Sequence, residues 1–150
     1  MLAATPRRIA AITAGMAEDQ LHAAPKVGEW SANEVLAHLR ACADVWGDCI
    51  AKILAHDNPT LRAVNPRTWI KKTDYREQEF QPSLQAYTAQ RGELLAVLEA
   101  LTPEDWSREA VVTGAGASLV RTVHKYAQWM AQHERPHTKQ IECIAITLRR

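Results

Sequence analysis

The last third of the chain carries a long apolar stripe at helical spacing, and two histidines interrupt it. The stripe advances by three or four residues at each step, the period of an amphipathic helix, through Leu119, Val123, Tyr126, Met130, His133, His137, Ile141, Ile144 and Leu148. Positions four apart lie only about 40° apart around such a helix. Two imidazoles on a core-facing stripe lose their water and need polar partners. We therefore predict a long helix over 118–148 in which His133 and His137 bind a metal ion.

The size and charge of the chain limit its other roles. Its 150 residues match one domain with its own core, so a single domain over 1–150 is expected. The net charge of +1 gives no field that would attract nucleic acid. No stretch approaches the roughly 20 apolar residues of a membrane helix, and no signal-peptide pattern is present. We expect a cytoplasmic protein with neither a nucleic-acid nor a membrane partner.

The cysteines are interpreted as small core residues. Cys42, Cys49 and Cys143 form no C-x-x-C pair. A zinc thiolate site would be expected to show closer spacing. A reducing compartment is consistent with such isolated thiols.

Four helices and almost no strand are predicted. The second helix has the clearest start, because Ser31 and Glu34 form the S-x-x-E capping box. The first opens at the cap-like pair Thr5 and Pro6. The predicted spans are about 5–23, 31–57, 82–101 and 118–148, with long connections at 59–81 and 106–117. This pattern indicates an all-α four-helix bundle with long crossover connections.

An open metal centre needs a third protein ligand, and His38 is the best candidate. It lies in the second turn of the best-capped helix, beside the apolar stripe, where it can face the last helix. The alternative for His38 is a core-edge histidine bonded to a carbonyl. His22 and His56 lie at helix ends and His124 lies on the opposite face from His133, so surface positions are expected for them. Three imidazoles from two helices suit Zn, Ni or Fe(II).

The segment His133–His137 also fits the H-E-x-x-H pattern of zinc metallopeptidases, which we disfavour. No convincing third ligand follows it, and no sheet edge is predicted that would align a peptide. Pro136 also removes the hydrogen bond to the Gln132 carbonyl and strains the helix.

Two polar neighbours of the histidines have candidate roles. Glu134 lies about 100° around the helix from His133. An exposed carboxylate at the pocket rim or in solvent is favoured for it, and catalysis as a general base is the alternative. Gln140, three residues after His137, is placed to hydrogen-bond a ligand imidazole. A solvated glutamine is the alternative there.

Three motifs, taken together and in this order, resemble the DinB/YfiT-like superfamily of metal-binding four-helix bundles. They read Trp30-Ser31-x-x-Glu34-Val35-Leu36-Ala37-His38-Leu39, Leu101-Thr102-Pro103-Glu104-Asp105-Trp106 and His133-Glu134-x-x-His137-x-x-Gln140-Ile141. The resemblance implies a divalent metal bound by His38, His133 and His137, and a homodimer. Some members of that superfamily are transferases or hydrolases that use low-molecular-weight thiols. Pro136 departs from the pattern, because a helix former is expected between the two histidines.

The leading hypothesis is a metal-dependent transferase or hydrolase acting on a small-molecule substrate, with a low-molecular-weight thiol as a further cofactor in the transferase case. The metal would act as a Lewis acid. The alternative is a non-enzymatic metal- or small-molecule-binding stress-response module, since no catalytic acid–base pair stands out.

Overall fold

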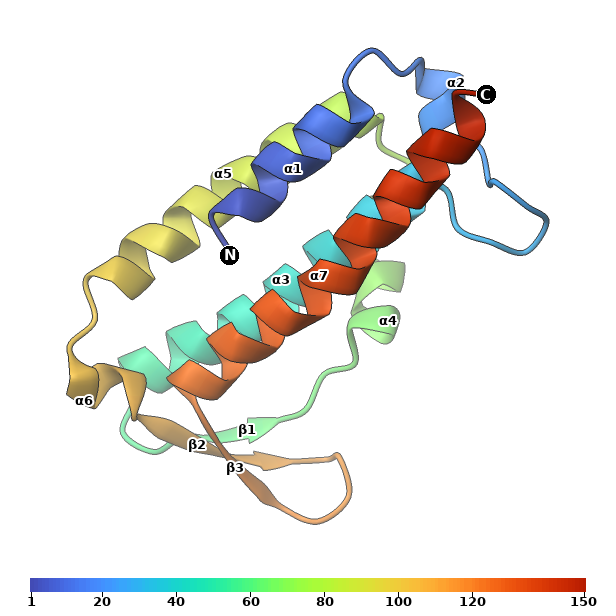
Figure 1. Ribbon diagram of the computed structural model, residues 1–150. Coiled ribbons are helices and arrows are strands. Elements are labelled where there is room, and N and C mark those ends of the chain that lie inside the picture. The colour runs from blue at the N-terminus through green and yellow to red at the C-terminus, as the bar shows by residue number, and fades with distance from the viewer.

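Four long helices form the frame of the computed structural model, which describes residues 1–150 (Figure 1). They are α1 (Ala4–Thr13), α3 (Ala32–Ala55), α5 (Phe80–Glu99) and α7 (Val123–Leu148). The helices α1 and α7 run in one direction, and α3 and α5 run in the opposite one. Both α3 and α1 pack against α7, and α5 packs against α1 and α3. The predicted four-helix bundle with long crossovers is confirmed.

Short elements fill the connections. Four are helical: α2 (Glu18–Leu21), α4 (Pro66–Trp69), the 3₁₀ helix η1 (Ile70–Lys72) and α6 (Pro103–Trp106). The other three are strands: β1 (Thr60–Arg62), β2 (Glu109–Thr113) and β3 (Leu119–Thr122).

The three strands form a small sheet at the end of the bundle where α3 ends and α7 begins (Figure 1). The strand β2 lies in the middle, parallel to β1 and antiparallel to β3. Val112 is paired with Leu61 on one side and with Leu119 on the other. The prediction of loops in these regions missed the sheet, because each strand is too short to show a period and pairs with a remote partner.

The start of α3 is where the capping box predicts it. The Ser31 hydroxyl accepts the backbone N–H of Glu34 at 3.1 Å, and the Glu34 carboxylate accepts the backbone N–H of Ser31 at 2.9 Å. The predicted first helix is too long, because α1 ends at Thr13 and Gly15 then takes a φ of +78°, typical of a helix stop. The predicted last helix starts too early, because Leu119 belongs to β3.

The helix α7 continues through Pro136 without interruption. Pro136 and Gln132 are both exposed, so the carbonyl that loses its helical partner can be hydrated. The expected strain therefore does not divide the helix between the two histidines. No helix of the structure has the length and apolar character of a membrane-spanning segment.

Candidate metal centre

The four side chains of the candidate site come in two pairs, each one helical turn apart. His38 and Cys42 lie on α3, and His133 and His137 lie on the adjacent antiparallel α7. The Nε2 atoms of His38 and His133 are 3.2 Å apart, and Cys42 Sγ is 3.6 Å from His38 Nε2. The His137 ring centroid lies 4.5 Å from that of His133 and 4.9 Å from that of His38. The structure thus brings the three predicted histidines together.

The distances among the ligand atoms of His38, Cys42 and His133 fit the shell of one ion. Around a tetrahedral zinc, two nitrogen ligands are separated by about 3.3 Å, and a nitrogen and a sulfur by about 3.6 Å. One ligand atom each from His38, Cys42 and His133 lies within 4.8 Å of the other two. Nδ1 of His133, on the other side of the ring from Nε2, is buried and has no hydrogen-bond partner. The residues present therefore fit a divalent metal.

Burial keeps the imidazoles in the form that binds metal. Desolvation, followed by the neighbouring imidazoles, lowers the pKa of His38 and of His133 to about 4. Both rings are therefore neutral at pH 7, with a lone pair available. The charges of Arg67 and Arg76 also contribute to lowering the pKa of His38. Burial raises the pKa of the Cys42 thiol to about 12, so it is protonated when no ion is bound.

Three neighbouring side chains orient the rings. Nδ1 of His137 lies 2.9 Å from Gln140 Oε1. With Nδ1–H as the donor, the ring keeps the lone pair of Nε2 free. The Trp30 indole stacks on His137 with a centroid distance of 6.4 Å, and the Trp46 indole meets His133 edge-on at 5.1 Å.

Glu134 lies elsewhere, although it follows His133 directly in the chain. It is 2% exposed, so the favoured expectation of an exposed carboxylate is wrong. Its carboxylate forms an ion pair with Arg91 and accepts the hydroxyls of Tyr87 at 2.8 Å and of Thr5 at 2.9 Å. The 100° step along α7 turns it towards α1 and α5 instead of α3. The H-E-x-x-H arrangement of a metallopeptidase is therefore absent.

Cys42 is the candidate ligand that the cysteine spacing failed to suggest. The available signal was its position four residues after His38, which places both on one face of α3. The other histidines are exposed as predicted: His22 bonds Glu18, His56 caps α3, and His124 packs on Trp106.

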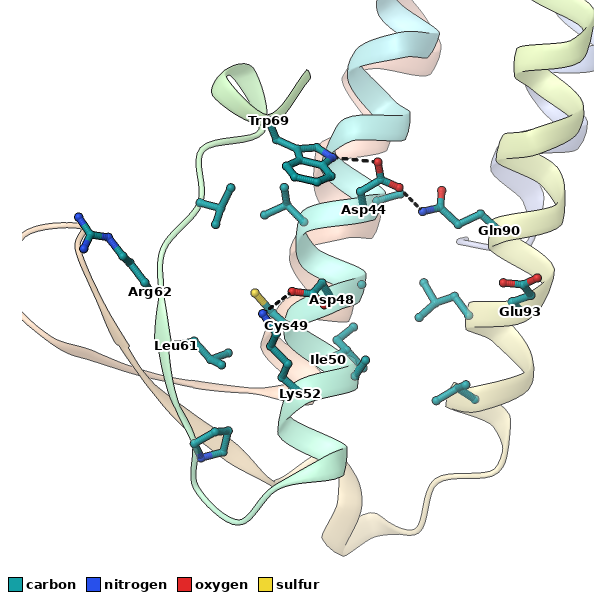
Figure 2. Close-up of a pocket in the computed structure, with 18 of the residues that line it drawn as sticks. Asp44, Asp48, Cys49, Ile50, Lys52, Leu61, Arg62, Trp69, Gln90 and Glu93 are labelled. Atoms are coloured by element: carbon teal, nitrogen blue, oxygen red, sulfur yellow. Dashed lines mark hydrogen bonds and ion pairs between the residues drawn. The ribbon is translucent and has the colours of Figure 1, made fainter. Parts of the chain in front are cut away.

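Two cavities lie beside α3. The smaller, of about 310 Å³, opens onto His38. The larger, of about 1050 Å³, is lined by α3, the β1 region and α5, and contains none of the three histidines (Figure 2). At its edge Asp44 accepts hydrogen bonds from Trp69 Nε1 at 3.0 Å, the Tyr75 hydroxyl at 2.6 Å and Gln90 Nε2 at 2.7 Å. Asp44 thereby links α3 to two other parts of the chain: the segment that contains Trp69 and Tyr75, and the helix α5.

Comparison with known proteins agrees with the fold and with the chemistry of the cluster. A Geobacillus thermodenitrificans protein named "Putative metal-dependent hydrolase" is 25% identical over 142 residues, covering 91% of this chain and 75% of the relative. A Bacillus licheniformis protein of the same description is 26% identical over 137 residues, covering 89% and 77%. The solved structure of YfiT from Bacillus subtilis, described as a probable metal-dependent hydrolase with an unusual four-helix bundle topology, superposes with a TM-score of 0.76 at 20% identity, covering 96% of this chain and 81% of YfiT. The DinB superfamily model matches residues 1–141, so the chain belongs to the DinB superfamily.

Proposed function

We propose that this protein is a metal-dependent hydrolase of small molecules, whose divalent ion is held by His38, His133 and His137. The observation that carries the proposal is the convergence of imidazoles from α3 and α7, two of them kept neutral by burial, on one small volume. The descriptions of the relatives support the reaction class. Zn, Ni and Fe all suit such a nitrogen-rich site.

A bound divalent ion supplies a Lewis acid that polarises the bond to be hydrolysed. The chain's own residues prepare the site for it. His38 and His133 present neutral nitrogens because burial disfavours their protonated forms. Gln140 holds the ring of His137 through Nδ1, and the indole of Trp30 covers the same ring. Few changes of side-chain conformation are therefore needed when the ion binds.

The geometry favours a supporting role in the core for Glu134 over a role as general base. Both carboxylate oxygens accept hydrogen bonds from the Arg91 guanidinium. Tyr87 and Thr5 occupy the remaining lone-pair directions. A general base must be within reach of the proton it takes, and the Glu134 carboxylate is instead bonded to these core side chains.

The proposal is tested by metal analysis of protein purified without a polyhistidine tag and reconstituted separately with Zn, Ni and Fe(II). We expect one bound ion per chain. The variants His38→Ala and His137→Ala should lose the ion. His124→Ala, which changes an exposed histidine on the same helix as His137, should retain it. A wild-type protein that binds none of these metals would contradict the proposal.

Turnover is tested with a panel of ester, amide and phosphoester substrates, with and without a chelator. Hydrolysis that the chelator abolishes and the metal restores supports the proposal. A metal that binds without any turnover would instead support the non-enzymatic binding module. A reaction seen only after adding a low-molecular-weight thiol would support the transferase. The homodimer and the cytoplasmic location stay predictions.

A further inference from the structure

A small cavity opens onto His38, which is the histidine of the cluster that lines it. His38 and Trp30 line it together with residues of α4 and η1. Its volume of about 310 Å³ is at the lower end of the range for ligand pockets. A substrate that enters here is therefore small.

The mouth of this cavity has an excess of positive charge. Arg67 of α4, Lys71 of η1 and Arg76 all line it. None of the three forms an ion pair with an acidic side chain. The one carboxylate of the lining, Glu34, has an oxygen engaged by the backbone N–H of Ser31. Three unpaired cations thus face one partly engaged anion.

The segment that carries these charges is fixed to α3. Trp69 and Tyr75, which flank Lys71 in the chain, both donate to Asp44 (Figure 2 shows Trp69 and Asp44). The side chain of Ile70 is buried against Ala37 and Ala41 of α3. The backbones that carry the cations therefore stay beside the cavity, which reduces the ordering needed to bind a ligand.

We infer that this cationic entrance, formed by Arg67, Lys71 and Arg76, selects substrates that carry a compact oxyanion, a carboxylate or a phosphate, next to the bond presented to the histidines. Guanidinium groups bind such planar or tetrahedral oxyanions through paired N–H donors. The inference rests on the proposed function in one respect: it takes the histidine site to be the catalytic site. The charge arrangement itself is independent of any metal.

The test measures binding of inorganic phosphate, acetate and neutral acetamide by calorimetry, using metal-loaded and metal-depleted protein. We expect phosphate or acetate to bind both forms, with an affinity that falls as salt is added, and acetamide to bind neither. The double variant Arg67→Gln/Lys71→Gln should weaken anion binding about tenfold with its metal content unchanged. Lys72→Gln is the matched control, because it removes a neighbouring charge that does not line the cavity.

The outcomes separate this inference from the proposed function. Tighter binding of phosphate assigns phosphorylated substrates, and tighter binding of acetate assigns carboxylic acids. Equal anion affinity in the double variant and the wild type, or no binding below about 10 mM, overturns the inference while the metal site stands. Charge-dependent anion binding by a protein that takes up no metal would instead overturn the proposed function and leave the cationic entrance in place.

Discussion

His133 and Glu134 are neighbours in the chain, yet they belong to two buried polar clusters of opposite character. The ion-pair cluster, formed by Glu134, Arg91, Tyr87 and Thr5, lies between α7, α5 and α1 and has a partner for every charge. The histidine cluster, formed by His38, Cys42, His133 and His137, lies between α7 and α3 and leaves Nδ1 of His133 unpartnered.

The difference shows which cluster is complete in itself. Arg91 and Glu134 are each 2% exposed, and burial of two charges is tolerated only where they are paired and hydrogen-bonded. In the histidine cluster, ring nitrogens and a sulfur with lone pairs lie close together, an arrangement that a cation stabilises. We therefore expect changes in the ion-pair cluster to affect folding, and changes in the histidine cluster to affect metal binding.

The largest effect is expected from Arg91→Leu, which leaves the Glu134 carboxylate buried without its countercharge. The free energy of unfolding of the metal-free protein should fall by about 3–5 kcal/mol, measured by urea denaturation. The double variant Arg91→Leu/Glu134→Leu should recover much of this loss, because it removes both charges. A single variant as stable as the wild type would show that the pair does not support the core.

Cys42→Ser should weaken metal binding by the histidine cluster. We expect Cys42 Sγ to bind the ion beside the imidazoles, so the variant should lose about 100-fold in zinc affinity, measured by competition with a chelator. The cobalt-substituted wild type should show a thiolate-to-cobalt absorption band that the variant lacks. Cys49→Ser is the control, since Cys49 lies outside the cluster. With Cys42 as a fourth protein ligand, hydrolysis would require the zinc to expand to five ligands during the reaction, as some catalytic sites do.

Glu134→Gln distinguishes support of the core from catalysis. Loss of the ion pair should lower the free energy of unfolding by about 2 kcal/mol. The kcat/KM per bound metal should remain close to that of the wild type, measured with any substrate from the hydrolysis panel. A fall of about 100-fold or more in kcat/KM, with metal content preserved, would identify Glu134 as a general base after all.

The smallest effect is expected from Gln140→Leu, which removes the acceptor that orients His137. Zinc affinity should fall about tenfold, as is typical when a partner of a ligand imidazole is lost. Gln132→Leu changes an exposed glutamine on the same helix and should leave the affinity unchanged. Equal zinc affinities in the two variants would show that Gln140 does not support metal binding.

Features set by neighbours in the chain could be predicted from the sequence. The start of α3 follows from Ser31 and Glu34, which cap each other within one turn. The histidines follow from their place on helical stripes, because a stripe shows which residues share a face. The bundle itself follows from the number and length of such stripes.

Features set by distant partners could not be predicted in this way. The burial of Glu134 depends on Arg91, which lies 43 residues earlier and on another helix. Leu119 continues the stripe of α7 by its spacing alone, but it pairs with Val112 in the sheet. Cys42 gains its place among donor atoms only when α7 packs on α3.

The hydrogen bond from Trp69 to Asp44 also provides a way to measure local motion in this protein. The segment that borders the cavity can leave α3 only when that bond opens. Exchange of the Trp69 indole proton with deuterated solvent therefore measures how often the segment detaches, and the exchange rate converts to the free energy of that local opening. One indole N–H thus reports the local opening of the segment that carries Arg67 and Lys71.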